Sequence, residues 1–384
     1  ARRKSGTPYG CPVELELLSR LQRAMHDDDV AAMVVTPGAD LQYVAGYDAK
    51  PLERLTALVI PRDGSPSLIA PALEAGEARD STFAREGGEV ITWTETQDPF
   101  LIVADLVGGV GSGAIAVDDH MWAQRVLRLR QVLSDRPQAL AGSILNDLRQ
   151  QKSPTEIELL QEAAAAIESV HRLVPSMVQP GMTESEVAHR IGAAIIDAGH
   201  TGVDFVIVAS GPNGANPHHS VSERVIGVGD PIVIDIGGTM PSGYRSDCTR
   251  TYVIGEASAD YSAAFEVLRA AQESTVAFVN DQRTCESIDA HARGLMHDYD
   301  LDGRPLDEYF IHRIGHGIGL ESHEEPYLVE GNTESLKPGM AFSIEPGFYV
   351  PGRFGARIED IVVCTEDGRR NLNTLSRDLM RIPA

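Results

Sequence analysis

The sequence predicts two domains, an α/β domain followed by an α+β domain with extensive antiparallel strand pairing. At 384 residues the chain exceeds the usual size of a single hydrophobic core. Short apolar runs alternate with helical patterns up to about residue 150, and beyond it longer helices are interspersed with strands. The polar segment 148–154 separates the two patterns, so we expect domains at 1–150 and 151–384.

The first domain begins with an amphipathic helix that starts near residues 12–15. No apolar run follows the basic residues 1–10, so no signal peptide is expected. Strands are predicted where apolar, often β-branched residues cluster, and helices where apolar residues recur at helical spacing. The predicted strands are 31–35, 56–60, 67–70 and 90–93, and the predicted helices are 73–79 and 121–133.

The second domain opens with helix-start chemistry at Ser153-Pro154-Thr155-Glu156, followed by a periodic run to about Val174. Further helices are predicted at 184–198 and 258–280. Strands are predicted at 205–209, 232–236, 249–254, 341–344 and 356–363.

Composition excludes several classes of protein. The net charge of -23 is spread along the chain, which indicates a soluble surface that repels nucleic acid. No run of eighteen apolar residues occurs, so no membrane-spanning helix is expected. The four cysteines lie far apart without C-x-x-C spacing, which argues against a disulfide framework or a cysteine zinc site and favours the reducing cytoplasm.

Four carboxylates stand in positions that should be buried. Asp235 ends the apolar run 231–234, and the glycines that follow open a turn that leads the chain back through Asp247. A second pair, Glu345 and Glu359, lies in two further apolar segments. Each pair can therefore end on neighbouring strands.

Four converging carboxylates would repel one another and lose solvation unless cations or protons neutralise them. Two divalent metal ions would balance their charge, with the neutral imidazole of His316 as fifth ligand. Oxygen-rich ligation with a single nitrogen favours manganese, iron or cobalt, with zinc as an alternative. The small residues around His316 would let the backbone approach the metals closely.

These segments resemble the pita-bread metallopeptidase family, which includes prolidase, Xaa-Pro aminopeptidase and methionine aminopeptidase. The resemblance covers the C-terminal domain strongly, and the N-terminal α/β domain looks like the one shared by the proline-specific members and creatinase. The spacing 247 − 235 = 12 is one residue longer than expected of the family, which a longer turn at Pro241-Ser242 could absorb. The motifs are Asp235-Ile-Gly-Gly, Ser-Asp247-Cys-Thr-Arg, Gly-His316-Gly-Ile-Gly-Leu, His323-Glu-Glu-Pro, Ile-Glu345-Pro-Gly and Arg357-Ile-Glu359-Asp.

The resemblance implies that a metal-activated hydroxide attacks the scissile carbonyl. Glu345 would shuttle the proton, and His323 would stabilise the tetrahedral intermediate. His218 would assist His323, although the neighbouring His219 could face the cleft instead.

Three further residues are candidates for substrate binding. The resemblance places His312 and Arg357 as supports beside the ligands, although His312 could equally be a hydrogen-bonded core residue. Arg54 could bind a substrate carboxylate with its guanidinium fork, or could form a solvated ion pair with Glu53. The resemblance also implies a homodimer.

The implied activity is hydrolysis of the peptide bond before proline. A proline amide lacks an N-H and has a fixed φ, so its cleavage requires a dedicated site. A compact N-terminal domain favours a dipeptidase, whereas Tyr327, where some prolidases carry arginine, leaves Xaa-Pro aminopeptidase as the alternative. The complete ligand set argues against a metal-free creatinase-like enzyme or a non-catalytic binding protein, and methionine aminopeptidase does not need this N-terminal domain.

Overall fold

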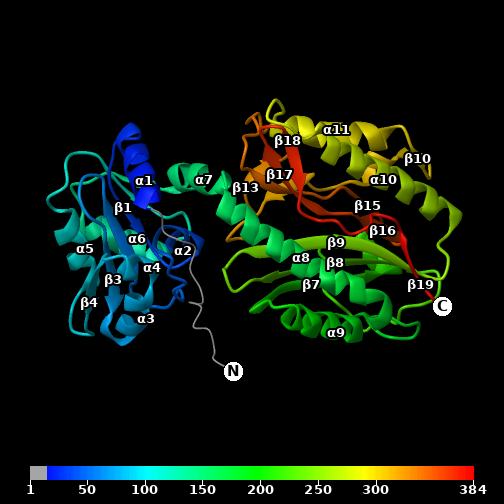
Figure 1. Ribbon diagram of the computed structural model, residues 1–384, viewed down its shortest axis with the longest axis horizontal. Helices are drawn as coiled ribbons and strands as arrows, with labels where there is room; N and C mark the ends of the chain where they lie inside the picture. Colours follow the sequence, from blue (N-terminus) through cyan, green and yellow to red (C-terminus); the bar gives the residue numbers. More distant parts are fainter. Residues whose placement is uncertain (1–14) are drawn as a thin grey trace, which may run out of the picture. The chain divides into compact units, whose positions relative to one another are not determined.

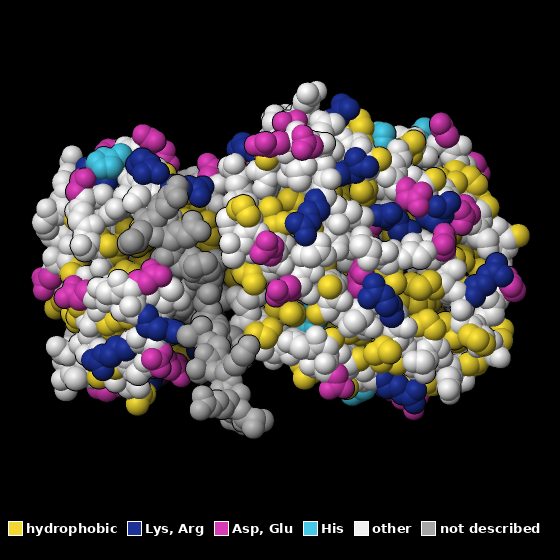
Figure 2. All heavy atoms as spheres, viewed as in Figure 1, with side chains coloured by type: hydrophobic (Ala, Val, Ile, Leu, Met, Phe, Trp, Pro, Cys, Tyr) yellow, Lys and Arg dark blue, Asp and Glu magenta, His cyan; other side chains and the backbone are white. Residues whose placement is uncertain are grey.

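The computed structural model describes residues 15–384, which divide into two compact units after Arg149. The basic stretch 1–10 and the predicted start of the first helix lie outside the described residues. Lys and Arg side chains are interspersed with Asp and Glu on the face of each unit that Figure 2 shows. None of the helices within 15–384 is both long and apolar enough to cross a bilayer.

The N-terminal unit is built on a six-stranded mixed sheet with the order β4-β3-β2-β1-β5-β6. Four of its strands are the predicted ones, and the central strand β1 is buried along its whole length. The strands β5 and β6 were not predicted from the sequence. The strands are β1 (Val30–Val35), β2 (Ala57–Pro61), β3 (Ser67–Pro71), β4 (Glu89–Trp93), β5 (Ala114–Val117) and β6 (Gln138–Leu140).

Helices cover this sheet and complete its core. Val103 and Val107 of α5 and Leu129 of α6 pack against the buried residues of the strands. The predicted helix at 73–79 begins as a short 3-10 turn, Ala72–Glu74, before α3. The helices are α1 (Leu15–Asp27), α2 (Ala39–Ala45), α3 (Ala75–Asp80), α4 (Thr82–Arg85), α5 (Pro99–Val107), α6 (Ala123–Val132) and α7 (Gly142–Gln150).

The C-terminal unit contains a four-stranded sheet, β19-β9-β8-β7, and a five-stranded sheet, β13-β12-β14-β17-β18. Its large strands pair antiparallel, so the predicted α+β class is confirmed. The strands of the first sheet are β7 (Gly202–Ser210), β8 (Pro231–Thr239), β9 (Arg245–Ile254) and β19 (Met380–Ile382). The strands of the second sheet are β12 (Gly315–Gly317), β13 (Glu324–Leu328), β14 (Ala341–Ile344), β17 (Asp360–Thr365) and β18 (Gly368–Asn371). Two small hairpins complete the unit. One is formed by β10 (Asp300–Leu301) and β11 (Arg304–Pro305), and the other by β15 (Gly347–Val350) and β16 (Phe354–Arg357).

Two helix pairs cover the outer faces of these sheets (Figure 1). The helices α8 (Pro154–Met177) and α9 (Glu184–Asp197) bury their apolar faces on β7, β8 and β9. The helices α10 (Ala259–Phe278) and α11 (Cys285–His297) pack on the five-stranded sheet. The inner faces of the two sheets are therefore free to carry polar side chains.

The prediction of one strand over 356–363 is wrong, because the chain forms two strands that are interrupted at Ile358 and Glu359. The Ile358 amide donates to the carbonyl of Pro346 at 3.3 Å, and the Glu359 amide donates to the carbonyl of Thr249 at 3.2 Å. The backbone amide of Glu359, which lies beside the five-stranded sheet, is therefore bonded to β9 of the four-stranded sheet. This link ties the two sheets together at one residue.

The long helix α8 begins where the sequence predicts. The Ser153 hydroxyl accepts a hydrogen bond from the Glu156 amide at 3.3 Å, and the Glu156 carboxylate accepts one from the Ser153 amide at 2.8 Å. This reciprocal capping box satisfies two amides that the first helical turn leaves unpaired. Pro154 follows in the first turn, where its missing N-H costs nothing.

Replacing the cap tests its contribution to stability. We expect Ser153→Ala to cost about 1 kcal/mol, because one helical amide loses its acceptor. That loss should lower the melting temperature of the C-terminal unit by roughly 2–4 °C in calorimetry. Ser176→Ala is the control, because this exposed serine near the other end of α8 bonds only the carbonyl of Leu173. Equal melting temperatures in the two variants would contradict the role of the cap.

Candidate metal centre

Two of the predicted carboxylates lie on adjacent strands of the four-stranded sheet. Asp235 of β8 pairs with Thr249 of β9, and Asp247 stands two residues before Thr249 on the same strand. Side chains two residues apart on a strand point to the same face, so both carboxylates project from the same side of the sheet. A turn at 240–244, closed by the Met240 amide on the Tyr244 carbonyl at 2.9 Å, accommodates the spacing of twelve residues.

The second pair extends the register of the five-stranded sheet. Ile344 pairs with Asp360, so Glu345 and Glu359 are the next opposed positions beyond the ends of β14 and β17. The Glu345 amide donates to the carbonyl of Ile314 at 2.8 Å, which holds it beside the strand of the histidine. The pair therefore stands at the edge where this sheet meets β9.

His316 lies in the short strand β12, which pairs with β13 and β14 of the five-stranded sheet. Its Nδ1 is 3.1 Å from the carbonyl oxygen of Gly317, which can only accept, so Nδ1 carries a hydrogen and Nε2 is the nitrogen that faces the carboxylates. The Nε2 atom is 3.2 Å from Glu345 Oε1 and 3.8 Å from Asp247 Oδ2. This is the orientation in which an imidazole can ligate a metal.

The glycines beside His316 lie against two neighbouring strands. A Cβ atom on Gly315 would lie 1.9 Å from the carbonyl oxygen of Ser343, and one on Gly317 would lie 2.2 Å from that of Glu325. Their small size is needed for the close approach of β14 and β13. The two glycines therefore allow β12, and His316 with it, to lie close to the neighbouring strands.

The five predicted ligands form two groups of three donors. Within each group the ligand atoms lie within 4.8 Å of one another. One group is Asp235, Asp247 and Glu359, and the other is His316, Glu345 and Glu359. Because Glu359 belongs to both, the arrangement offers two adjacent cation positions with a shared carboxylate.

The pKa values of the clustered carboxyl groups show that their negative charges repel one another. Burial raises the pKa of Asp247 well above its usual range, and the charges of Glu359 and Asp235 raise it further. Burial and the charges of Glu345 and Asp235 likewise raise the pKa of Glu359 to about 8. The Oδ1 atom of Asp235 is buried and has no hydrogen-bond partner among the described residues. An orphaned acceptor inside a cluster of repelling carboxylates fits divalent cations.

Glu345 differs from the other carboxylates of the cluster. Burial acts to raise its pKa, but the hydrogen bond and charge of His316 outweigh burial and lower the pKa to about 2. Ser343 Oγ also donates to Glu345 Oε1 at 3.1 Å. Glu345 is therefore ionised at neutral pH.

Arg357 and His312 lie beside the cluster and are joined by a residue that the sequence reasoning missed. His312 Nδ1 donates to the Arg313 carbonyl at 2.8 Å, so its Nε2 accepts from the Tyr349 hydroxyl at 2.8 Å. Arg357 Nη1 donates to the same hydroxyl at 2.8 Å, and Arg357 Nη2 donates to Asp235 Oδ2. Tyr349 carried no signal in the sequence beyond its place four residues after Glu345.

Thr249 is a second residue without a predicted role. Its hydroxyl donates to Glu359 Oε2 at 2.8 Å and accepts from Arg357 Nε at 3.2 Å. The signal for it was available, because a residue two positions after Asp247 on a strand faces the same side.

The cluster lies at the floor of a cavity of about 440 Å³. His218 lines this cavity, whereas His219 Nε2 bonds Glu184 Oε2 at 2.8 Å. The ring of His323 stands 3.9 Å from that of His316, and burial together with the charge of His316 lowers the pKa of His323 to about 4. The lining residues are Phe205, Ile207, Pro217, His218, Asp235, Asp247, His312, Arg313, His316, His323, Glu345, Arg357 and Glu359.

Arg54 belongs to the N-terminal unit, where two carboxylates hold it. Its Nε donates to Glu95 Oε1 at 2.7 Å and its Nη1 donates to Glu53 Oε1 at 2.5 Å. The ion pair with Glu53 is the structural alternative that the sequence suggested. A substrate-binding role for Arg54 stays a prediction.

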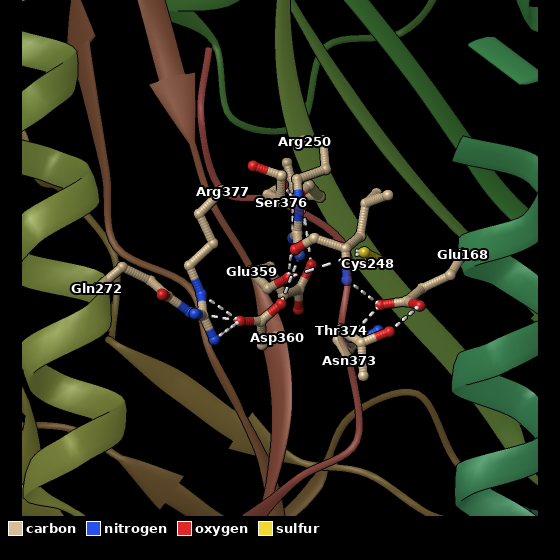
Figure 3. A network of polar contacts seen from close by, with 12 residues as sticks. Glu168, Cys248, Arg250, Gln272, Glu359, Asp360, Asn373, Thr374, Ser376 and Arg377 are labelled. Carbon is tan, nitrogen blue, oxygen red and sulfur yellow. Dashed lines mark hydrogen bonds and ion pairs between the residues drawn. The ribbon is translucent and has the colours of Figure 1, made fainter. Parts of the chain in front are cut away.

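A buried network supports Glu359 from behind (Figure 3). The Arg250 guanidinium donates to the carbonyls of Thr249 and Glu359 and forms an ion pair with Asp360 Oδ1 at 2.7 Å. Asp360 also accepts from Gln272 of α10 at 3.1 Å. Burial acts to raise the pKa of Asp360, but the positive charges of Arg250 and a second arginine, Arg377, lower it. The network holds the backbone of the shared ligand in place.

The same network reaches the helix on the other side. Glu168 of α8 accepts hydrogen bonds from the Leu375 amide at 2.7 Å and from the Thr374 hydroxyl at 3.0 Å. Cys248 lies within the network, where its thiol is 3.8 Å from the Glu359 carbonyl oxygen. Burial raises its pKa well above the usual range, as for a cysteine that packs in the core and does not react.

Comparisons with known proteins agree with this geometry. Residues 158–366 match the model of metallopeptidase family M24, and residues 18–151 match the Creatinase/Prolidase N-terminal domain. A relative from Mycobacterium tuberculosis, named "Probable dipeptidase PepE", is 47% identical and covers 98% of each chain. The Xaa-Pro dipeptidase of Lactobacillus helveticus is 33% identical over 95% of this chain and 99% of its own.

A solved structure shows the same fold along nearly the whole chain. The recombinant prolidase from Thermococcus sibiricus superposes with a TM-score of 0.88 at 34% identity, covering 97% of this chain and 100% of its own. The family resemblance and the fold class that the sequence predicted are confirmed. The chain therefore belongs to metallopeptidase family M24 and carries a Creatinase/Prolidase N-terminal domain.

Proposed function

We propose that this metallopeptidase hydrolyses the peptide bond before proline, with Xaa-Pro dipeptides as its substrates. The observation that carries the proposal is the pair of donor groups that share Glu359 at the floor of the cavity. The relatives named Xaa-Pro dipeptidase and prolidase support the choice of substrate. The proposed metal ligands are Asp235, Asp247, His316, Glu345 and Glu359.

The donor set supports two divalent ions, which we propose to be manganese, with cobalt, iron or zinc as alternatives. Four carboxylates and one imidazole supply mostly oxygen ligands, a set that manganese accepts. When bound, such ions would polarise the scissile carbonyl and lower the pKa of a water nucleophile.

The side chains around the ligands supply proton transfer and orientation. Glu345 is ionised at neutral pH, so its carboxylate can accept a proton and pass it to the departing proline nitrogen. The neutral imidazole of His323, together with His218, can donate hydrogen bonds to the negative charge that develops on the carbonyl oxygen. Both line the cavity beside the cluster.

The hydroxyl of Tyr349 is bonded to both His312 and Arg357. Burial lowers the pKa of His312, so the imidazole is neutral and accepts from the tyrosine hydroxyl. Arg357 holds Asp235 through an ion pair within the cavity wall. We propose that the two residues fix the ligand geometry and shape the substrate site.

Xaa-Pro aminopeptidase acting on longer peptides is the second candidate within the family. A metal-free creatinase-like enzyme or a non-catalytic binding protein is the alternative of another class, and the complete donor set argues against it. We further propose domains at 1–150 and 151–384, a homodimer and a cytoplasmic location. The burial of three free cysteines, Cys248, Cys285 and Cys364, supports a reducing compartment.

Removal of Glu345 tests the proposed chemistry. We expect Glu345→Ala to lower kcat/KM for Ala-Pro by about 10²- to 10⁴-fold, because proton transfer and one ligand are lost together. Asp247→Ala should act similarly through the metal ligation. Glu330→Ala, at an exposed glutamate, is the control and should keep wild-type kcat/KM. Full activity in either ligand variant would refute the site.

Substrate length separates the two candidate activities. We expect efficient hydrolysis of Ala-Pro and poor hydrolysis of Ala-Pro-Ala, because a dipeptidase site closes beyond proline. The measurement is kcat/KM for both peptides with the same metal-loaded enzyme. Comparable values for the two would instead favour the aminopeptidase.

The raised pKa of Glu359 predicts a pH-dependent stability of the metal-free protein. The native carboxyl keeps its proton up to about pH 8, whereas an unfolded glutamate loses it near about 4.3. The native state binds more protons between these values, so stability should fall as pH rises through this window. We expect Glu359→Gln to reduce this fall in melting temperature, and manganese to restore stability to the wild type at pH 8.

The matched control for this measurement is Glu330→Gln, which removes a carboxyl from the surface. It should keep the pH dependence of the wild type. An unchanged dependence in Glu359→Gln would show that this carboxyl is not held protonated by the cluster.

A further inference from the structure

One loop of the C-terminal unit brings His218 to the cavity. The loop 210–222 continues from the end of β7 and contributes Pro217 and His218 to the cavity lining. His218 is exposed, and no hydrogen bond among the described residues engages its imidazole. Its amide donates to Asn216 Oδ1 at 3.3 Å. The position of the imidazole therefore depends on the backbone of the loop.

The loop is held by a single buried carboxylate. Glu184, at the start of α9, is fully buried. Its Oε1 accepts hydrogen bonds from the Ser210 amide at 2.8 Å and from the Ser210 hydroxyl at 2.7 Å. Its Oε2 accepts from the Ser222 hydroxyl at 2.6 Å and from His219 Nε2 at 2.8 Å, and Asn213 Nδ2 donates to both oxygens at 3.1 Å. Four residues of the loop, including both of its ends, thus converge on one side chain.

These hydrogen bonds keep Glu184 ionised. Burial acts to raise its pKa, but the hydrogen bonds from Ser222, Ser210 and His219 outweigh burial and lower the pKa. Glu184 also lies in the first turn of α9, where the helix dipole favours a negative charge. Hydrogen bonds to a charged group are about twice as strong as those between neutral groups. Release of the loop would leave this charge without partners in the interior, which opposes the release.

The loop is held by β16 as well. A Cβ atom on Gly214 would lie 3.0 Å from the amide nitrogen of Gly355, and one on Gly355 would lie 1.9 Å from the carbonyl oxygen of Gly214. The backbone of the loop therefore lies directly on this strand. Arg357, at the end of β16, donates to the Pro217 carbonyl at 3.4 Å. Two separate elements, α9 and β16, thus fix the loop on which His218 stands.

His219 is the link between Glu184 and His218. Because His219 follows His218 directly, its bond to the buried carboxylate restrains the backbone beside His218. The His219 amide also donates to the Asn216 carbonyl at 3.2 Å, which closes a turn around Pro217 and His218. One imidazole is thereby committed to the interior, and the preceding one is left to line the cavity.

We propose that Glu184 is a positioning residue for the hydrolysis, which fixes the loop 210–222 through His219 and so holds His218 at the cavity. This inference rests on the role proposed above for His218 in the cleavage of Xaa-Pro bonds. Glu184 itself does not line the cavity and belongs to neither donor group, so it acts through the loop. When its hold is lost, the His218 imidazole spends less time where it can donate to the carbonyl oxygen.

A double-mutant cycle on the hydrolysis of Ala-Pro tests this route. We expect Glu184→Gln to lower kcat by about 10- to 100-fold with little change in KM, because a misplaced donor affects the transition state more than the bound substrate. His218→Ala alone should lower kcat by about 10²- to 10³-fold. In the His218→Ala background, Glu184→Gln should cost no more than about twofold, since the residue through which it acts is gone. Losses that multiply in the double variant would overturn the inference.

Substitutions at His219 test the same link with less disturbance of the interior, and they decide the question alone where Glu184→Gln does not fold. His219→Ala removes one bond to the buried carboxylate and should lower kcat by about 10-fold. His219→Gln keeps an amide donor and should recover most of this loss. Wild-type kcat in His219→Ala, or equal losses in the two variants, would contradict the proposed link.

Glu186→Gln is the matched control, because this exposed glutamate lies in the same helical turn and bonds the Thr183 amide, which a glutamine also caps. It should keep the wild-type kcat. Manganese affinity in titration calorimetry should be equal in the wild type, Glu184→Gln and the control, because none of the proposed ligands lies on the loop or on α9. A weaker affinity in Glu184→Gln would overturn the inference and leave the proposed function intact. A metal-loaded wild type that does not cleave Ala-Pro would overturn the proposed function itself.

Discussion

The concentration of buried carboxylates at one point between two sheets is the constraint on which the rest of the site depends. Four acidic side chains with ligand atoms a few ångströms apart cannot all be ionised in a low-dielectric cavity unless positive charge compensates them. The raised pKa values of Asp247 and Glu359 express this conflict, as does the orphaned oxygen of Asp235. Bound cations resolve it, and protons resolve it in their absence.

The fold meets this constraint by distributing the ligands over strands whose registers are fixed independently. Asp235 and Asp247 come from one hairpin, Glu345 and Glu359 from the ends of β14 and β17 in the other sheet, and His316 from β12, which pairs with β14 in that same sheet. The Glu359 amide crosses to β9, so the shared ligand belongs to both sheets. Arg250 then holds the backbone on either side of this crossing, and its charge is balanced by Asp360.

Positive charge is placed in the cavity according to what it must neutralise. Arg357 is buried and committed to a ligand and to Tyr349, so it contributes to the architecture of the cluster. Arg313 is exposed, lines the same cavity and is stacked on the Tyr327 ring. The same residue type therefore stands in two different environments, which differ in burial and in hydrogen-bond partners.

The sequence by itself determined the α+β class, the family, most of the long strands and the residues that form the acidic cluster, because apolar runs and short motifs are local properties of the chain. It did not determine the break in the strand at Glu359, the closeness of Gly315 to Ser343, or the bridging positions of Tyr349 and Thr249, which depend on contacts between residues up to 110 positions apart. The turning of His219 toward Glu184 and the stacking of Arg313 on Tyr327 are likewise products of tertiary packing. Local pattern fixes which side chains are acidic, basic or apolar, whereas only the packing of distant strands decides which of them face one another.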